Sequence, residues 1–380
     1  MRPLVLLALL AGIPAAVAAQ SSQFGVRGLG LPGREQSARA MGNAGAFSFF
    51  DPGSSVSPAS IAYLGSLTAT FTVLGDYRSS TDPAGSSSIR DPRFPQFAVG
   101  GPIPHKSIWV GLSYSNYTTR DYSLVFPATV ILRGLPVAVN DTIQSKGSIN
   151  DLQLAVAFRP TSRIAIGLGG HIFTGINRLA VHRVFSDSAY LPSRQSSELS
   201  FAGVGVSLGV LGQLTRSLTL GLLARADGHV SVQEDSLPTE QRVDLPITLG
   251  AALRWRPSGK LQFAGQVLKH NWSSANADIV ANGGVGAVNT VEAAAGLEFT
   301  PNPRRPERHP LRLGFRYAQL PFPLAVGSNA KEYGATVGTG YSFAADRAAL
   351  DLSVERVWRN QDAQYYERAW LVSVGITVKP

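Results

Sequence analysis

Segments with a two-residue apolar period fill most of this chain and restrict what it can fold into. Successive side chains of a strand point to opposite faces, so this period predicts strands with one apolar and one polar face. About fourteen segments after residue 65 show it. They span 66–76, 93–101, 106–117, 147–159, 162–174, 197–211, 216–228, 244–256, 260–270, 289–300, 309–320, 331–344, 347–358 and 366–378. Most match the 9–11 residues that a tilted strand needs to cross a bilayer, whereas sandwich strands usually have five or six.

The links between these segments alternate in length. Short links rich in turn residues, such as GPIPHK, RPTSR and RPSGK, follow every second segment, and the links between them are longer. An outer-membrane barrel has short periplasmic turns and long outer loops. A Greek-key sandwich requires no such alternation, and a soluble β-rich protein is disfavoured for the same reason. The sequence therefore predicts an all-β fold, a transmembrane antiparallel β-barrel of about 14 strands.

The stretch 297–317 indicates which strand face meets lipid. We predict that its apolar residues point outward: Leu297, Phe299, Leu311, Leu313, Phe315 and Tyr317. Charged residues of the other face then point into the lumen. Antiparallel pairing brings Glu298 opposite Arg312 and Glu292 within one diagonal step of Arg316, which predicts a lumen ionic network of these four residues. Stabilisation of the barrel is the favoured role of this network, ahead of transport.

The first residues, MRPLVLLALLAGIPAAVAAQ, predict a secretory signal peptide over residues 1–19, with Arg2 before a short apolar run. That run is too short to span a bilayer, and no later stretch has 18 apolar residues. The chain has no cysteine, so no disulfide holds it together. Its net charge of +9 is scattered without a basic motif, so we expect no nucleic-acid partner.

Residues 20–65 do not alternate, and they are dense in Gly, Ala and Ser. Such a segment before the barrel (66–380) can hang in the periplasm or fill the lumen. A barrel of about fourteen strands is wide enough to need filling, which favours an N-terminal hatch or plug in the lumen. We predict that the following residues form the hatch and its ligand contacts: Gly42, Gly45, Phe47, Phe49, Phe50, Ser57, Pro58 and Ala59. The three aromatic residues could equally be the passive core of the plug.

The stretches SARAMGNAGAF and FFDPGSSVSPASIAYL resemble the start of the long-chain fatty acid transporter (FadL-like) family of outer-membrane proteins. They are also similar to the related PorV-like barrel subunit of a Bacteroidetes secretion system. The C-terminal pattern from LRLGFRYAQLPFP to WLVSVGITV resembles these barrels too. The resemblance implies fourteen strands, a hatch inside the barrel and lateral passage of hydrophobic molecules into the membrane. Ser57, Pro58 and Ala59 stand where the family has an Asn-Pro-Ala motif, so its Asn is replaced.

The leading functional hypothesis is a porin-like channel of the bacterial outer membrane for passive uptake of fatty-acid-like hydrophobic molecules, a form of lipid transport. The expected partners are a hydrophobic small molecule or lipid and the lipids of the outer membrane. Proline cannot donate to a strand ladder, so Pro92 and Pro95 make the second strand the weakest. We expect an inward kink and a lateral opening there, at Gly100, Gly101 and Pro102.

The alternative is a barrel that does not transport but docks a secreted protein or lipoprotein at its outer loops. The link 118–146, with its apolar run 124–132, is a docking or membrane-dipping loop or an outer hairpin. Enzyme function is not expected, because no GxSxG nucleophile elbow at a strand-to-helix turn, no P-loop and no HExxH motif occurs. The six histidines are spread along the chain, so we predict no metal site and no cofactor.

Overall fold

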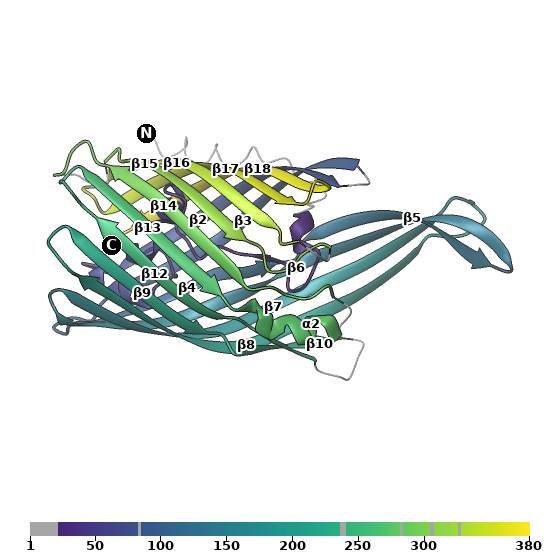
Figure 1. Ribbon diagram of the computed structural model, residues 1–380, viewed down its shortest axis with the longest axis horizontal. Coiled ribbons are helices and arrows are strands. Elements are labelled where there is room, and N and C mark those ends of the chain that lie inside the picture. Colours follow the sequence, from purple (N-terminus) through teal and green to yellow (C-terminus); the bar gives the residue numbers. More distant parts are fainter. Residues whose placement is uncertain (1–21, 83–84, 236–240, 282–283, 305–307, 326–327) are drawn as a thin grey trace, which may run out of the picture.

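The computed structural model describes residues 22–82, 85–235, 241–281, 284–304, 308–325 and 328–380. In these residues, 14 antiparallel strands form a closed barrel, shown in Figure 1. The predicted fold is thus confirmed, whereas the predicted signal peptide lies outside the described residues. No helix in the described ranges is both long and apolar enough to cross a membrane.

Each barrel strand corresponds to one predicted segment. In ring order the strands are β2 (Thr68–Asp82), β3 (Gly85–Pro102), β4 (Ile108–Thr119), β6 (Leu135–Thr161), β7 (Ile164–Phe185), β8 (Ser193–Gln213), β9 (Leu218–Ala226), β12 (Ile247–Trp255), β13 (Leu261–His270), β14 (Thr290–Phe299), β15 (Leu311–Gln319), β16 (Lys331–Phe343), β17 (Ala348–Gln361) and β18 (Tyr365–Val378). Pairing of β18 with β2, for example Val374 with Val73, closes the ring.

The strand faces separate as the alternation predicts. On β15, Leu311 and Phe315 are 44% and 51% exposed on the outside of the wall, whereas Arg312 and Arg316 are 1% and 6% exposed on the inside. Exposed aromatic side chains also lie near strand ends, among them Phe158, Trp255, Phe299 and Phe343. The wall therefore presents an apolar outer surface and a polar lining.

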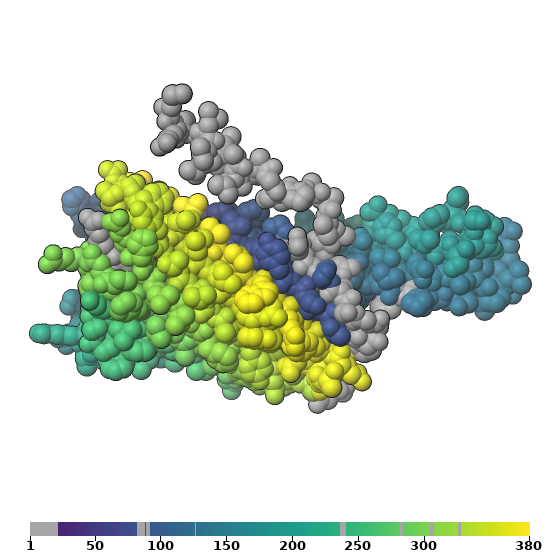
Figure 2. All heavy atoms as spheres, turned by 90° about the horizontal axis from the view of Figure 1, so that it is seen from above, coloured from purple at the N-terminus to yellow at the C-terminus, as the bar shows by residue number. Residues whose placement is uncertain are grey.

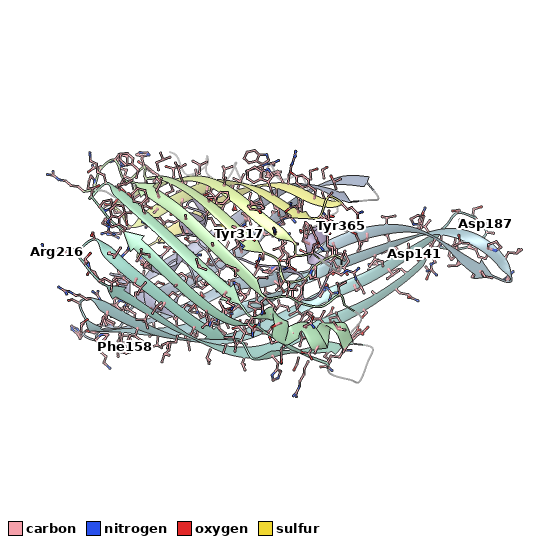
Figure 3. All side chains as sticks on the ribbon, viewed as in Figure 1. Asp141, Phe158, Asp187, Arg216, Tyr317 and Tyr365 are labelled. Carbon is pink, nitrogen blue, oxygen red and sulfur yellow. The ribbon has the colours of Figure 1, made fainter. Side chains whose placement is uncertain are left out.

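Three strands continue beyond the ring and form an extension. The links of one barrel end are short turns, and we call that end the turn end; the opposite one is the loop end. At the loop end, β6, β7 and β8 project outward together with β5 (Tyr122–Leu132), as Figures 1 and 2 show. In Figure 3, Asp141 and Asp187 mark this extension, and Arg216 lies at the turn end. The link 118–146 is thus an outer β-hairpin.

Two smaller units cover the loop end. Strands β10 (His229–Glu234) and β11 (Gln241–Asp244) form a hairpin that pairs with β8. The link after β13 folds into η4 (Trp272–Ala275) and α2 (Asn276–Ala281), which the alternation does not predict. Apolar side chains of these units pack against the lumen face of β6, β7 and β8. This apolar cluster, which we call the loop-end cluster, thus closes the loop end of the barrel.

The N-terminal segment, residues 22–65, lies in the lumen. Its elements are η1 (Gln23–Gly25), β1 (Leu31–Pro32), α1 (Ala38–Met41), η2 (Ser48–Phe50) and η3 (Pro58–Tyr63). Wall glycines let it approach closely on several sides: an added Cβ at Gly167 would lie 2.4 Å from Ala59 N, and one at Gly314 2.2 Å from Asn43 C. The segment therefore rests against strands that are far apart in the ring, with almost no room for side chains between them.

Candidate functional site

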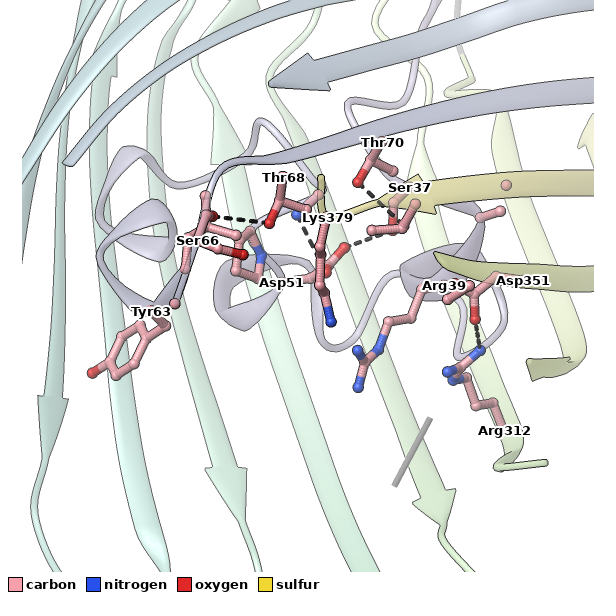
Figure 4. Close-up of a pocket in the computed structure, with 18 residues that line it drawn as sticks. Ser37, Arg39, Asp51, Tyr63, Ser66, Thr68, Thr70, Arg312, Asp351 and Lys379 are labelled. Atoms are coloured by element: carbon pink, nitrogen blue, oxygen red, sulfur yellow. Dashed lines mark hydrogen bonds and ion pairs between the residues drawn. The ribbon is translucent and has the colours of Figure 1, made fainter. Parts of the chain in front are cut away.

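The N-terminal segment, the hatch, lies between two cavities of the lumen. The turn-end cavity has a volume of about 330 Å³, and both apolar and charged side chains line it; Figure 4 shows Ser37, Arg39, Asp51 and Lys379 around it. The loop-end cavity has a volume of about 130 Å³ and lies beneath the loop-end cluster. The segment Pro32–Gln36 lines the loop-end cavity, and Ser37–Arg39 lines the turn-end cavity. The hatch is thus the partition between the two ends of the lumen.

The loop-end cavity has an apolar and a charged side. Its apolar lining comes from the hatch, three barrel strands and two loops: Val56, Tyr117, Leu223, Leu268, Trp272, Leu320 and Pro321. Trp272 is 4% exposed, and its ring packs edge-on against Phe322 with the centroids 5.1 Å apart. The Trp272 ring thus forms the roof of the cavity, and Phe322 packs against that ring. The charged side comes from Arg34 and Glu35 of the hatch and from carboxylates and arginines of the wall.

Arg34 joins the hatch to β16 and β17. Its Nη2 lies 2.9 Å from Glu332 Oε1, and its Nη1 lies 2.5 Å from Glu355 Oε2. Burial alone would lower the pKa of Arg34, but the nearby Glu355 carboxylate raises that pKa above its usual value. Arg34 is therefore charged, and Glu332 also contacts Arg316 and Arg359. Removing the guanidinium would leave Glu355 buried beside the hatch without this partner.

Glu35 joins the hatch to β9. Arg225 donates from Nη1 to Glu35 Oε1 at 2.7 Å, from Nη2 to Asp151 Oδ2 at 2.7 Å and from Nε to Asp227 Oδ1 at 2.5 Å. Three carboxylates thus surround one guanidinium. Burial raises the pKa of Glu35 above its ordinary value, although Arg225 acts in the opposite direction. The two-residue period of the sequence already places Asp151 and Arg225 on the inward faces of their strands. The sequence analysis did not single out these two residues, although this pattern could have indicated them.

A hydrogen-bond chain on three neighbouring strands has the residue types of a hydrolase triad. His171 Nε2 lies 2.8 Å from Ser207 Oγ, and His171 Nδ1 lies 2.8 Å from Asp151 Oδ2. All three side chains are almost fully buried, and Ser207 lines neither the loop-end nor the turn-end cavity. Arg225 also neutralises the carboxylate that would orient the imidazole. These three residues therefore form a buried hydrogen-bond network on the lumen side, apart from the two cavities.

The predicted hatch residues lie in the plug, away from the loop-end cavity. Phe49 is fully buried and Phe50 is 7% exposed, and both pack with Leu223 and Ala252 of the wall. Phe47 packs on the edge of this cluster. Gly42 caps the C-terminus of α1, and Gly45 has a φ of +85° that a side chain would strain. Ser57 and Pro58 line a cavity of about 20 Å³, and Ala59 lies against Gly167.

The four predicted network residues form two separate pairs. Arg312 Nε lies 2.8 Å from Glu298 Oε2, and Arg312 Nη1 lies 2.6 Å from Asp351 Oδ1 beside the turn-end cavity. Arg316 Nη2 lies 3.0 Å from Glu292 Oε2 at the loop-end cavity. Only the second pair thus borders the site. In the described part of the chain, no group of three His, Asp or Glu side chains could hold a metal ion.

The wall is interrupted at a position different from the predicted Gly100, Gly101 and Pro102. Gly100 pairs with Thr68 and Gly111, while Gly101 and Pro102 pair with Val110 and Trp109, so all three belong to a regular ladder. The ladder between β3 and β4 ends at Gln96 and Ser115. The preceding residue is Pro95, which has no N–H for continuing it. We call this end of the ladder the seam.

Beyond the seam, the hatch takes the place of β3 beside β4. Leu31 pairs with Thr119 and Pro32 with Thr118, while β6 occupies the other edge of β4. Gly33 N also donates to Tyr117 O at 2.8 Å. Strand β1 is therefore both a part of the hatch and a short stretch of the wall.

A third cavity, the seam cavity, lies at this junction and has a volume of about 60 Å³. Its lining includes Pro95 of β3 and Asn116 and Thr119 of β4. It shares Pro32, Gly33, Arg34 and Arg359 with the loop-end cavity. The hatch residues 32–34 thus stand between the loop-end cavity and the interruption in the wall.

The structure of this protein is similar to solved structures of other barrels, although its sequence matches no known family. No known family model and no curated protein matches the sequence. A solved Pseudomonas aeruginosa FadL homologue has 14% identity and a TM-score of 0.62, over 92% of this chain and 99% of that one. The monoaromatic hydrocarbon channel CymD has 12% identity and a TM-score of 0.56, over 92% and 98% of the chains. The Ralstonia pickettii toluene transporter TbuX has 12% identity and a TM-score of 0.56, over 92% and 99%.

At these identities the similarity establishes the architecture alone. It extends over nearly the whole length of each solved barrel. The chain therefore has the fold of the FadL-like outer-membrane β-barrels.

Proposed function

We propose that this protein is a bacterial outer-membrane channel for passive uptake of hydrophobic small molecules, gated by its hatch and releasing them sideways into the bilayer. The observation that carries the proposal is the position of residues 32–34, which separate the loop-end cavity from the seam cavity. Structurally similar barrels include a toluene transporter and a monoaromatic hydrocarbon channel, which supports the same class of cargo. The exposed apolar outer wall suits contact with acyl chains.

The loop-end cavity is suited to a single small apolar group. Its volume of about 130 Å³ is close to the roughly 150 Å³ of an engineered apolar cavity that binds benzene. Trp272, Leu268 and Leu223 supply an apolar lining for a ring or a short length of chain. The charged side is internally paired, because Arg34, Arg225 and Arg316 each contact carboxylates. A ligand therefore meets apolar surface and hydrogen-bonding groups there.

The gating step is a movement of β1. Two residues of β1 pair with β4, which is a small number of backbone hydrogen bonds to break compared with a full barrel strand. Displacing residues 31–34 would join the two cavities that they separate. The ligand would then reach the seam, where β3 and β4 are not paired, and enter the bilayer without crossing the turn-end cavity.

The proposal is tested by uptake into cells that lack their own hydrophobic channels. Cells expressing the protein should accumulate radiolabelled toluene or decanoate several-fold faster than cells expressing an empty vector. Liposomes with the purified protein should not swell in a sugar solution, because the hatch blocks an aqueous path. Equal accumulation with and without the protein would refute hydrophobic uptake, and rapid swelling would refute the gated lateral route.

A further inference from the structure

The outer face of β16, β17 and β18 carries positive charge only. All four acidic residues of these strands point into the lumen and are buried: Glu332, Asp351, Glu355 and Glu367. Three basic residues lie on the outer face, and we call them the basic cluster: Lys331, Arg356 and Arg368. Arg356 pairs with Trp370, which is 50% exposed on the outside of the wall, and Arg368 pairs with Trp358. This part of the wall faces the viewer in Figure 2, where β17 and β18 are yellow.

Neither arginine of the basic cluster is paired with a carboxylate in the described part of the chain. The Arg356 guanidinium carbon lies 4.9 Å from the centroid of the Trp370 ring and 5.9 Å from that of the Trp358 ring. The Arg368 guanidinium carbon lies 4.8 Å from the centroid of the Tyr366 ring, and its Nε contacts the Tyr366 hydroxyl. A guanidinium over an aromatic ring uses its face, so N–H donors at its edge remain available for an anion.

The basic cluster lies at the level of the outer membrane interface. Phe343, an exposed aromatic residue of the turn end, pairs with Ala348 at the start of β17. From Ala348 to Trp358 the strand rises about 33 Å, or roughly 25 Å along the barrel axis at a tilt of about 40°. That is about the height of the apolar band of an outer-membrane barrel. Trp358 and its partner Arg368 therefore lie near the head groups of the outer leaflet, and Arg356 lies slightly deeper in the bilayer.

This position determines which anion the two arginines can bind. A charged side chain on the lipid-facing side of a barrel is destabilising, although less so near the interface than at the midplane. The phosphates of lipid head groups are the anions at the interface. Arg356 and Arg368 are diagonal neighbours across the β17–β18 ladder, about 7–8 Å apart in the backbone, so both side chains can reach one phosphate. The planar guanidinium also matches phosphate oxygens with parallel hydrogen bonds.

An apolar track for acyl chains continues from the basic cluster toward the turn end. On the outer face Val354 pairs with Val372, and Leu352 pairs with Val374. The side chains of Leu352, Val354 and Val372 are exposed. A lipid whose phosphate contacts the arginines would thus place its acyl chains along this track. A free phosphate ion would gain none of this apolar contact.

We infer that β17 and β18 form a binding site for the phosphate of an outer-leaflet lipid, held by Arg356 and Arg368. Lys331 adds a third positive charge to the cluster and favours a lipid with more than one phosphate. The bound lipid is a fixed neighbour of the wall and not the cargo of the channel. The inference goes beyond the proposed function and shares with it only the location in the outer membrane.

The test is equilibrium binding of radiolabelled lipid A, which carries two phosphates, to the full-length protein in a non-ionic detergent. Lipid A from which both phosphates have been removed enzymatically is the neutral probe with the same acyl chains. We expect the phosphorylated form to bind at least tenfold more tightly, and a large excess of inorganic phosphate to leave it bound. Equal binding of the two forms would overturn the inference. Displacement by inorganic phosphate would overturn the assignment to a lipid.

Two variants locate the site. Arg356→Met and Arg368→Met should each weaken binding of phosphorylated lipid A about tenfold and leave binding of the neutral form unchanged. Both variants should fold, because each removes a charge from the lipid-facing side of the wall, and heat-modifiable migration on a gel checks this. If one variant fails to fold, the other decides the matter.

The matched control is Arg178→Met on β7. Arg178 is an exposed arginine that already has a carboxylate partner, since its Nε lies 2.7 Å from Glu198 Oε2. Its substitution should leave the binding of phosphorylated lipid A unchanged. Unchanged binding in folded Arg356→Met or folded Arg368→Met would overturn the assignment, as would an equal loss of binding in the control.

The inference and the proposed function fail in different experiments. Toluene uptake by cells expressing Arg356→Met should equal that of the wild type, because this residue lines none of the three lumen cavities. A wild-type protein that supports toluene uptake but binds both forms of lipid A equally would retain the channel and lose the lipid site. A protein that binds phosphorylated lipid A selectively but supports no uptake would retain the lipid site and lose the channel function.

Discussion

Arg34 and Glu35 are consecutive in the chain, yet they form ion pairs with distant strands of the barrel. Arg34 contacts Glu332 on β16 at 2.9 Å, and Glu35 contacts Arg225 on β9 at 2.7 Å. Four strands stand between β9 and β16 along the shorter way around the ring, according to the strand order. The two contacts hold the hatch across the lumen at the point where it borders both the loop-end cavity and the seam cavity.

The ion pairs of Arg34 and Glu35 should contribute differently to the stability of the folded protein. Arg34→Met leaves Glu355 buried without its guanidinium partner, and breaking a buried pair in this way typically costs about 3–5 kcal/mol. Glu35→Gln leaves Arg225 with Asp151 and Asp227, so its cost should be below about 1 kcal/mol. Denaturant unfolding of the two variants in detergent micelles measures the difference. Equal destabilisation by both substitutions would contradict the role given to Arg34.

Wall glycines should control how tightly the hatch seals. Gly167→Ala places a Cβ about 2.4 Å from the backbone of Pro58 and Ala59, so the hatch must move away from β7. Gly170→Ala, on the same strand, meets nothing within 4 Å and is the matched control. Liposome swelling in a sugar solution should increase for Gly167→Ala alone. If liposomes with either variant fail to swell, the contact between Gly167 and the hatch does not seal the lumen.

Substitution of Phe49 should reduce stability, whereas substitution of Trp272 should reduce ligand binding. Phe49→Ala removes a fully buried ring of the plug core and should lower the unfolding free energy by about 3–5 kcal/mol. It does not line the loop-end cavity, so ligand affinity should change little. Trp272→Ala removes part of the cavity roof and should weaken toluene binding several-fold. Loss of binding in folded Phe49→Ala would restore a direct ligand role for this residue.

The extension should loosen at low pH. The hydrogen bond from Arg183, at 2.7 Å, lowers the pKa of Asp141 below its ordinary value. A lowered pKa means that this contact stabilises the extension above the unfolded pKa of about 3.9 and is lost as pH falls through the lower folded value. Amide hydrogen exchange in β6 and β7 near Asp141 should therefore become faster at about pH 3 than at pH 7, after correction for intrinsic rates. Asp141→Asn should remove most of that difference.

The fold could be predicted because the barrel repeats one rule along the chain. Segments such as 309–320 alternate strictly, and both faces of β15 lie as the alternation indicates. The extension was harder to predict, because β6 and β7 continue the same period past the ring, and side chains such as Val137 and Val139 of β6 are still buried there. The helical turns after β13 lack any period at all. Sequence periodicity thus predicts the positions of the strands, but it does not predict where a strand leaves the barrel and enters the extension.

The site was predicted less completely, for physical reasons. Pro95 signalled a weak second strand, but sequence alone did not show that β4 pairs with Leu31 and Pro32 of the hatch instead. Contacts of this kind depend on how the plug packs in three dimensions. The predicted aromatic residues turned out to pack in the plug core, since glycines such as Gly221 and Gly250 leave room for Phe49. The arginines of the seam cavity came together only in the folded barrel.

The most direct test of the account is a reversible tether between the hatch and the wall. Leu31 and Thr119 are directly paired, so cysteines there should lie within disulfide range, and the chain has no other cysteine. The control pair, Ala98→Cys with Ser113→Cys, crosses the intact β3–β4 ladder. Oxidised Leu31→Cys/Thr119→Cys should lose at least 90% of decanoate and toluene uptake and recover it on reduction, while the control keeps full uptake in both states. Undiminished uptake through the oxidised tether would contradict release past β1.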